Sequence, residues 1–287
     1  MSPAAPLRDI IYRLRQGAGG HFPGAHRSRH GDCGMEFRSH RPLMSGGDPR
    51  RLDVQASLRD PLGGWWARLH AERTSVPVVL VADLSASMGF VGRQSRREVL
   101  ADLTDSLAWS AQRGGDAFGF VGAATDLPSH WQLPPTRQRG AGRVLAQALR
   151  SHAFDEVSGR SAQGMKGVPG WLPKQRSLVF LVSDFHWSES LLNEVLEGLA
   201  RHEVVPVVIW DRAEYELPRR NGLAWLRDAE GAGEHLIWVR PSLRRRSADR
   251  LAQAQRQLEA RMQRHHLRPL YLLDGFDVDR VNAHFHG

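Results

Sequence analysis

The chain has 287 residues, of which 41% are hydrophobic and 24% charged, so it can bury a substantial core and is not a disordered chain. The net charge of +8 favours acidic partners, but the arginines are spread along the sequence, which favours a protein partner over nucleic acid. The single cysteine, Cys33, excludes an internal disulfide, and the longest apolar runs, 76–82 and 204–210, are too short to span a membrane, so we expect a cytoplasmic protein without membrane contact.

Residues 1–75 form a glycine-rich, basic segment, which predicts extended segments and turns rather than long helices. From residue 76 the pattern changes to alternating strands and helices. We therefore divide the chain into an N-terminal segment, 1–75, that packs on the core, and an α/β domain, 76–287.

The α/β domain is predicted from apolar runs and amphipathic segments. In chain order we expect a strand at 76–82, a helix at 95–112, a strand at 117–122, a helix at 141–152, a strand at 177–183, a helix at 188–201, a strand at 204–210, an edge strand at 234–239, a helix at 247–265 and a strand at 268–273. This alternation predicts a doubly wound, mostly parallel sheet sandwiched by helices, which is a Rossmann-like fold.

Four oxygen-bearing side chains follow two of the buried strands. Asp83, Ser85 and Ser87 form a D-x-S-x-S pattern after the strand at 76–82, and Asp184 ends the strand at 177–183. The carboxyl ends of parallel strands meet at one edge of the sheet, where ligands bind in such folds. Carboxylate and hydroxyl oxygens suit a hard divalent cation. The sequence therefore predicts a site for Mg²⁺, or Mn²⁺ or Ca²⁺, with coordination positions left open.

This D-x-S-x-S pattern with a later aspartate resembles the metal-ion-dependent adhesion site of von Willebrand factor A domains. The wider chain resembles the bacterial domain-of-unknown-function-58 family, the MoxR-associated von Willebrand A-like proteins. The stretches that carry the resemblance are GDCGMEFR at 31–38, GDPRRLD at 47–53, DLSASM at 83–88, and the segment at 211–230 that begins Asp211-x-x-Glu214-x-x-Leu217-Pro218. They span residues 24–230, most of the chain.

The resemblance implies a von Willebrand A fold and a metal bound by Asp83, Ser85, Ser87 and Asp184. It further implies a MoxR-type AAA+ ATPase as partner, in a chaperone-like assembly that matures or remodels another protein complex. A non-catalytic, metal-dependent protein-interaction module is therefore the leading hypothesis.

The chain departs from the family pattern at two places. Val54 stands where the family usually has tryptophan, and the threonine that completes the family's metal site has no counterpart. Thr125 and Thr136 are the nearest hydroxyls, and Arg143 would place a cation in that region. These departures imply a weak metal site.

Other functions are kept open. A metal-dependent hydrolase would use Asp184 or His186 as its general base, and the arginine content allows a nucleic-acid binder. No G-x-S-x-G elbow and no P-loop occur in the sequence. The alternative reading of the Asp and Ser residues is a turn that caps the following helix.

The N-terminal motifs suggest no reaction. Asp48, Arg50 and Asp53 are read, together with Glu36, as a salt-bridged scaffold. The adjacent tryptophans at 65–66 resemble family positions that pack the N-terminal segment.

Overall fold

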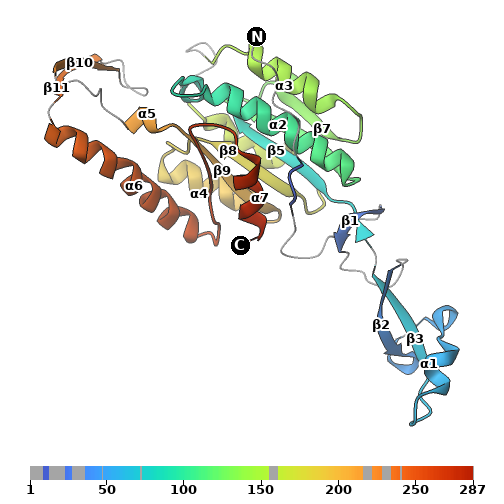
Figure 1. The fold of residues 1–287 in the computed structure, drawn as a ribbon. Helices are drawn as coiled ribbons and strands as arrows, with labels where there is room; N and C mark the ends of the chain where they lie inside the picture. The colour runs from blue at the N-terminus through green and yellow to red at the C-terminus, as the bar shows by residue number, and fades with distance from the viewer. Residues whose placement is uncertain are drawn as a thin grey trace. The chain divides into compact units, whose positions relative to one another are not determined.

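The computed structural model describes residues 9–12, 23–27, 36–46, 48–71, 73–154, 161–215, 222–227, 234–239 and 241–286. The chain divides into two compact units (Figure 1). The larger unit comprises Met1–Tyr12, Pro77–Arg113 and Ala117–Gly287, and the smaller comprises Arg13–Val76 with Gly114–Asp116. The predicted motif positions 31–35 and 47, the pair Leu217-Pro218 and residues 228–230 lie outside the described residues.

The larger unit is built on a six-stranded sheet in the order β12-β9-β8-β5-β6-β7. Its strands are β5 (Pro77–Asp83), β6 (Ala117–Ala123), β7 (Gln132–Thr136), β8 (Leu178–Ser183), β9 (Glu203–Trp210) and β12 (Leu270–Leu273). All neighbouring strands are parallel except β6 and β7. Every residue of β5, β6 and β8 is buried, as expected for continuous apolar runs inside a parallel sheet.

Helices cover both faces of the sheet (Figure 1). One face carries α2 (Arg96–Arg113), α3 (Ala141–Ser151) and α7 (Val278–His286). The other is covered by the 3-10 segment η6 (Gln163–Trp171), α4 (Glu189–Gly198) and α6 (Pro241–Gln263), whose apolar side chains share one core cluster with Val79, Val81 and Leu181. The predicted α/β sandwich is therefore present as a mostly parallel, Rossmann-like sheet between two helical layers.

Close packing of α2 and α3 depends on a glycine. A Cβ built on Gly142 would lie 2.1 Å from the Cβ of Ala108, so no larger residue fits between these helices. Short elements complete the larger unit: the 3-10 turns η3 (Ala86–Gly89) and η4 (Ser129–Trp131), and the helix α5 (Arg212–Tyr215). Among the residues described, no helix combines the length and apolar character needed to cross a bilayer.

The sheet differs from the prediction at its margins. The segment predicted as an edge strand, β11 (Glu234–Val239), does not join the main sheet and pairs instead with β10 (Gly222–Arg227) in an antiparallel ribbon. The two edges of the sheet are β12 and β7, and the sequence did not predict β7 because Pro134 and Pro135 interrupt its strand pattern. Proline is tolerated on an edge strand, where its missing N–H faces outward.

The smaller unit is a hairpin with short helical turns. Its elements are β1 (Pro23–Arg27), β2 (Glu36–Pro42), η1 (Leu43–Ser45), η2 (Pro49–Arg51), α1 (Val54–Leu58), β3 (Trp66–Ala71) and β4 (Arg73–Thr74). The antiparallel pairs are β2 with β3 and β1 with β4. The predicted extended segments and turns are thus observed in the described part of this unit.

Asp53 holds the hairpin together through an ion pair with Arg68, as the scaffold interpretation predicts, whereas Arg50 forms no ion pair among the described residues. Its Oδ2 accepts from Arg68 Nε at 2.7 Å and lies 2.9 Å from His40 Nε2, while its Oδ1 accepts from the N–H of Ala56 at 3.1 Å. One carboxylate therefore connects β2, β3 and the start of α1. The hydrogen bond from Arg68, then those from His40 and Ala56, hold the pKa of Asp53 well below its usual range.

Asp53→Asn is expected to loosen this hairpin without unfolding the larger unit. Amide hydrogen exchange over 36–71 should accelerate about tenfold or more, because the charge-assisted bonds to β2 and β3 are weakened together. Since the folded-state pKa is lowered, the stabilisation is complete at neutral pH and is lost only in acid, as pH falls through that lowered pKa. Asp48→Asn, which affects only the exposed cap of η2, is the control; equal exchange in both variants would contradict the role of Asp53.

Candidate functional site

The carboxyl ends of β5 and β8 place the two predicted aspartates. The strands are parallel neighbours, with Ala82 of β5 opposite Val182 of β8. Asp83 is the last residue of β5, and Asp184 follows the last residue of β8. Both side chains are almost completely buried, with 0% and 1% of the residue exposed. The sheet register alone therefore brings the two carboxylates to one place.

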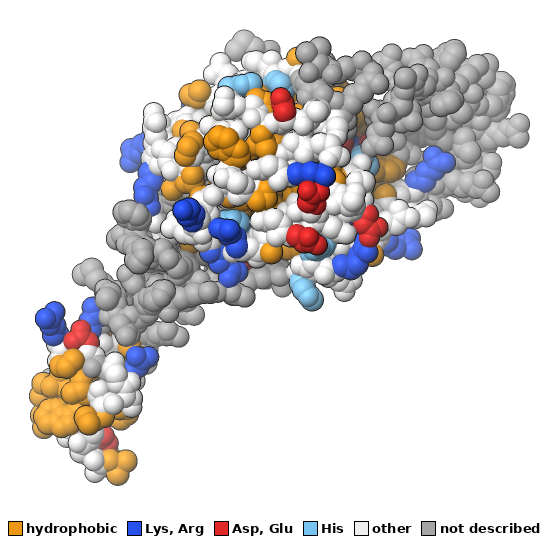
Figure 2. Space-filling view, turned by 180° about the vertical axis from the view of Figure 1, so that it is seen from behind, with side chains coloured by type: hydrophobic (Ala, Val, Ile, Leu, Met, Phe, Trp, Pro, Cys, Tyr) orange, Lys and Arg blue, Asp and Glu red, His pale blue; other side chains and the backbone are white. Residues whose placement is uncertain are grey.

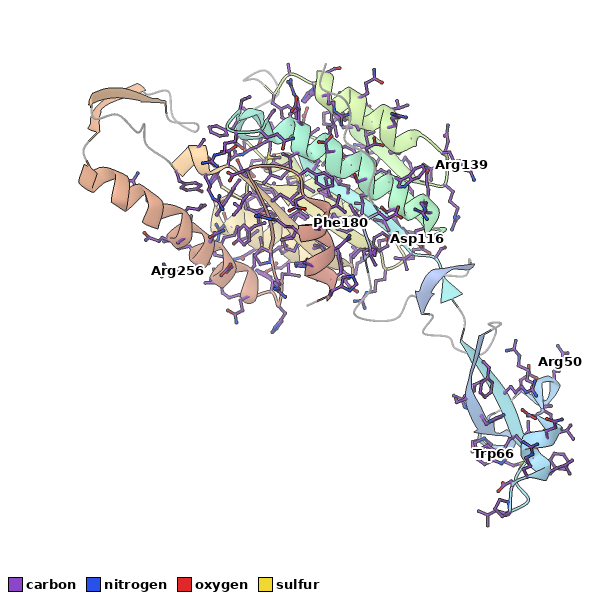
Figure 3. The ribbon with its side chains drawn as sticks, viewed as in Figure 1. Arg50, Trp66, Asp116, Arg139, Phe180 and Arg256 are labelled. Carbon is purple, nitrogen blue, oxygen red and sulfur yellow. The ribbon has the colours of Figure 1, made fainter. Side chains whose placement is uncertain are left out.

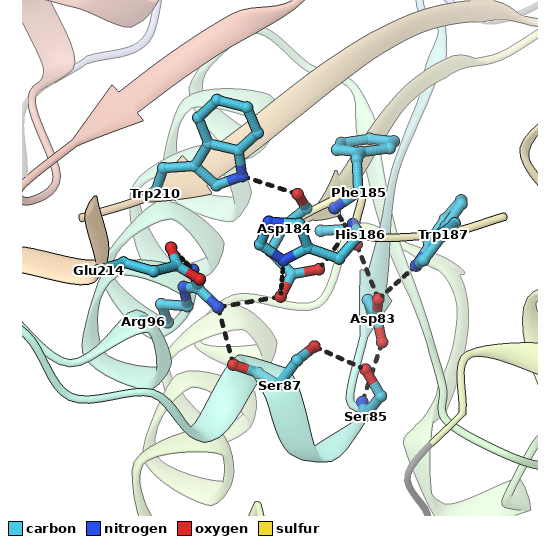
Figure 4. Close-up of polar contacts among 11 residues, drawn as sticks. Asp83, Ser85, Ser87, Arg96, Asp184, Phe185, His186, Trp187, Trp210 and Glu214 are labelled. Carbon is cyan, nitrogen blue, oxygen red and sulfur yellow. Dashed lines mark hydrogen bonds and ion pairs between the residues drawn. The ribbon is translucent and has the colours of Figure 1, made fainter. Parts of the chain in front are cut away.

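Asp83 accepts hydrogen bonds from neutral donors (Figure 4). Its Oδ1 accepts from the N–H of Ser85 at 2.9 Å, and its Oδ2 accepts from the Ser183 hydroxyl at 2.7 Å and the Trp187 indole N–H at 2.9 Å. No cationic side chain pairs with it among the residues described. The buried charge of Asp83 is therefore solvated by dipoles alone.

The two serines connect Asp83 to Asp184. The Ser85 and Ser87 hydroxyls lie 3.3 Å apart, the N–H of Ser85 donates to Asp83, and the Ser87 side chain lies close enough to Asp184 to help lower its pKa. All four predicted residues therefore belong to one hydrogen-bonded cluster. That they bind a metal ion stays a prediction.

A buried arginine lies beside this cluster. Arg96, the first residue of α2, is 2% exposed, and its Nη1 donates to Asp184 Oδ2 and to the Ser87 carbonyl, both at 2.9 Å. Its Nη2 forms an ion pair with Glu214 of α5. The guanidinium thus connects three segments: the loop with Ser85 and Ser87, called here the serine loop, the loop that begins at Asp184, and α5 (Figure 4).

Asp211 fixes the connection between the serine loop and α2. Its carboxylate accepts from the N–H of Arg93 at 2.5 Å, and a Cβ on Gly92 would lie 2.3 Å from its Cγ. The Asp211-x-x-Glu214 motif therefore has a structural meaning here: one residue binds the backbone before α2, and the other binds the first side chain of α2.

The chain turns sharply just after Asp184. Phe185 adopts a positive φ of 54°, which is unfavourable for an aromatic residue. Its N–H donates to the Ser183 hydroxyl at 2.9 Å, and its ring packs against Trp187 with centroids 5.1 Å apart. This conformation lets Ser183, Asp184 and Trp187 all face the site from one short segment.

His186 is, after Arg96, the second basic side chain beside Asp184. Its Nδ1 lies 3.2 Å from Asp184 Oδ2, and its ring stacks on Trp210 with an interplanar angle of 8°. Burial lowers the pKa of His186, but the hydrogen bond and charge of Asp184 outweigh it and leave the pKa above the ordinary value. The Asp184 carboxylate therefore stabilises the protonated form of the His186 ring relative to a free imidazole.

The pKa values of the two aspartates are shifted in opposite directions. Burial, followed by the like charge of Asp184, raises the pKa of Asp83. Burial also acts to raise the pKa of Asp184, but His186 and Arg96 outweigh it and hold that pKa well below the usual range. Among the residues whose side chains are described, cations compensate Asp184 but not Asp83.

The donor set fits a hard divalent cation. Three carboxylates, Asp83, Asp184 and Glu214, share the site with the guanidinium of Arg96, so acidic groups outnumber the arginine beside them. Two serine hydroxyls add compact neutral oxygens. Within the described ranges no group of three or more His, Cys, Asp or Glu side chains is placed to hold a metal, so any ion here would depend on the serines.

The structure also shows what the sequence missed. The charged partners Arg96 and Glu214 were not predicted at the site. The cation considered there, Arg143, interacts instead with Asp105 of α2. The two threonines considered as ligands are engaged elsewhere: the Thr125 hydroxyl donates to the Ser161 carbonyl at 3.3 Å, and the Thr136 hydroxyl accepts from the N–H of Gln138 at 3.1 Å.

Comparison with protein families places the chain. Residues 39–258 match the family described as "Protein of unknown function DUF58", which is well over half of the sequence. The chain belongs to the DUF58 family. This confirms the resemblance to that family, and the matched range includes Asp53, the loop with Ser85 and Ser87, Asp184 and the Asp211-x-x-Glu214 motif.

Known relatives of this DUF58 protein include mycobacterial proteins. Uncharacterized protein Rv1480 of Mycobacterium tuberculosis and Uncharacterized protein Mb1516 of Mycobacterium bovis are each 25% identical over 244 residues, covering 84% of this chain and 75% of the relative. Among solved structures, BatB from Bacteroides thetaiotaomicron is 16% identical with a TM-score of 0.47, covering 74% of this chain and 96% of that one. An aerotolerance-related membrane protein from Bacteroides fragilis is 17% identical with a TM-score of 0.40, covering 61% and 87%.

Proposed function

We propose that this DUF58 protein is a non-catalytic, cation-dependent protein-interaction module. The observation that supports it is Asp83, a buried carboxylate that faces Asp184 and has no cationic partner among the described residues. A buried, uncompensated charge is costly unless a proton or a cation neutralises it. Two serine hydroxyls in hydrogen-bonding range of these carboxylates complete a donor set for Mg²⁺.

In this proposal Asp83, Ser85, Ser87 and Asp184 hold the ion, with Mn²⁺ or Ca²⁺ as substitutes. The ion would supply a positive centre with coordination positions not filled by the chain, and a carboxylate of the partner would complete them. Arg96 and Trp187 contribute by orienting the two aspartates, and Asp211 by holding the backbone between the serine loop and α2. The fold would then be that of a von Willebrand factor A domain.

The contacts of His186 and Asp184, the two candidate general bases, favour a binding role over hydrolysis. A general base must be unprotonated and free to accept a proton at working pH. His186 is held by Asp184 Oδ2, 3.2 Å from its Nδ1, and by stacking on Trp210, and Asp184 Oδ2 also accepts from Arg96 at 2.9 Å. Neither group is poised to activate a metal-bound water, which supports a module without catalysis.

The proposed partner is a MoxR-type AAA+ ATPase, acting with this protein on another protein complex. We expect the purified wild-type chain to bind such an ATPase in Mg²⁺ and to lose about tenfold or more in affinity in EDTA. The Ser85→Ala/Ser87→Ala variant should bind equally weakly in both conditions, because it keeps every charge but lacks the neutral oxygen ligands. Surface plasmon resonance with the ATPase immobilised measures this.

The matched control is Ser151→Ala, which removes an exposed hydroxyl whose hydrogen bond stays within α3. It should bind like the wild type. Binding that is unaffected by EDTA and by the double serine substitution would refute the cation-dependent mechanism, even if the complex itself forms.

A further inference from the structure

The smaller unit turns its large apolar side chains outward. The exposed fraction is 93% for Met44, 54% for Val54, 82% for Leu58, 94% for Leu62 and 57% for Trp65. These five residues are called here the apolar end. Trp65 is exposed within this unit, whereas Trp66 is half-buried and donates its indole N–H to Asp60.

Backbone contacts bring these side chains to one end of the hairpin. The N–H of Leu43 donates to the Trp65 carbonyl at 2.7 Å, which holds the turn that carries Met44 against the backbone of Trp65. Asp60 binds the N–H groups of Leu62 and Gly64, which closes the turn that carries Leu62. Figure 2 shows hydrophobic side chains gathered on the surface of the smaller unit, with basic side chains beside them.

The hairpin does not need these side chains for its own core. In the described part of the smaller unit, the buried apolar side chains are Ala67 and Val76, whereas Asp53 and Ser57 are buried through polar contacts. A contiguous apolar surface that a small unit does not use internally marks an interaction site.

The acidic and the basic side chains around the apolar end differ in whether they are engaged within the hairpin. The aspartates whose side chains are described here, Asp48, Asp53 and Asp60, are occupied by hydrogen bonds within the hairpin. Arg50 and Arg59, by contrast, are exposed and form no ion pair among the described residues; Figure 3 shows Arg50 and Trp66 in this unit. The surface therefore offers apolar side chains flanked by unpaired guanidinium groups, which suits an acidic partner.

We propose that the apolar end is a docking surface for an acidic segment of another protein that carries large apolar side chains. A lipid surface suits it less well, because Asp48 is exposed and Asp60 is partly exposed at the same end, and carboxylates are costly to place in hydrocarbon. A protein can match these groups individually. This surface uses none of the residues of the cation cluster, and it gives a role to the motif residues Asp48, Arg50 and Asp53 of the smaller unit.

The test uses the full chain and a fluorescent synthetic peptide of alternating leucine and glutamate, with a lysine-substituted peptide for comparison. Fluorescence anisotropy should show micromolar binding of the glutamate peptide, and none of the lysine peptide. Leu62→Ser/Trp65→Ser should weaken binding about tenfold or more, and Arg50→Glu/Arg59→Glu should do the same. All four side chains are exposed, so these variants are expected to fold.

Two controls separate this site from others. Val144→Ser, which removes an exposed apolar side chain from α3, should leave binding unchanged, and so should EDTA or Asp83→Asn. Failure of the glutamate peptide to bind, equal binding of the lysine peptide, or binding that both double variants retain would overturn the proposal. So would binding to phosphatidylserine vesicles that Leu62→Ser/Trp65→Ser abolishes, because the surface would then be a membrane contact.

Discussion

Arg96→Gln is expected to lower the free energy of unfolding of the metal-free protein by about 3–5 kcal/mol. The reason is that Arg96 is the buried cation of the site, with its guanidinium bonded to Asp184, Glu214 and the Ser87 carbonyl. Glutamine cannot neutralise the carboxylates and is too short to reach all three partners. The loss should therefore be far larger than for an exposed ion pair.

Mg²⁺ should recover part of this loss. In the wild type the guanidinium already neutralises Asp184 and repels an incoming ion, so the stabilisation by Mg²⁺ should be larger in Arg96→Gln than in the wild type. Urea unfolding in EDTA and in Mg²⁺, followed by far-ultraviolet circular dichroism, measures both effects. Arg96→Lys keeps the positive charge, so its free energy of unfolding should lie between those of the wild type and Arg96→Gln.

Arg113→Gln is the matched control, because Arg113 forms an exposed pair with Asp9 at the other end of α2. It should change the free energy of unfolding by about 1 kcal/mol or less. A comparable loss in Arg96→Gln and Arg113→Gln would mean that Arg96 is not the buried counter-ion described here.

The positions of the predicted ligands followed from the sequence because strand ends are visible in it. The apolar runs that became β5 and β8 end directly before Asp83 and Asp184, and neighbouring parallel strands place such residues at one edge of the sheet. At these two strand ends, the position predicted from the local sequence pattern agrees with the position in the sheet. The central sheet and most of its helices were predictable for the same reason.

Arg96 was not predictable in this way. It lies among Arg93 and Arg97 at the start of an amphipathic helix, and an arginine in that position is ordinarily exposed. Which of these arginines turns inward depends on Asp184 and Glu214, which are 88 and 118 residues away in the sequence. A charge that is buried only because distant residues compensate it leaves no local signal.

The sheet edge was missed for a related reason. In β7 two prolines hide the alternation that marks a strand, although its pairing with β6 is retained around them. The apolar run of β11, conversely, reads as a strand of the main sheet because a sequence pattern does not identify the partner strand. Strand pairing is a tertiary property, and it was predictable only where burial on both faces required a central position.

Asp83→Asn is expected to abolish stabilisation of the protein by Mg²⁺. In the wild type, an ion present at about one hundred times its dissociation constant should add about 2.7 kcal/mol to the free energy of unfolding. For a unit of this size that corresponds to a rise of about 5–10 °C in the unfolding midpoint. Differential scanning calorimetry in Mg²⁺ and in EDTA should give this shift for the wild type and for Asp126→Asn, an exposed control, and none for Asp83→Asn.

The effect of pH follows from the raised pKa of Asp83. A carboxyl group whose folded-state pKa lies above its unfolded-state pKa binds a proton more tightly in the folded protein, so metal-free stability falls as pH rises between these two values. Mg²⁺ must displace that proton, and its stabilising effect should therefore grow over the same interval. Asp184 has a lowered pKa and titrates in more acidic solution, where its stabilising contribution is lost as pH falls. A Mg²⁺-induced shift in Asp83→Asn equal to that of the wild type would place the ion elsewhere, and a shift independent of pH would show that the Asp83 carboxylate does not bind it.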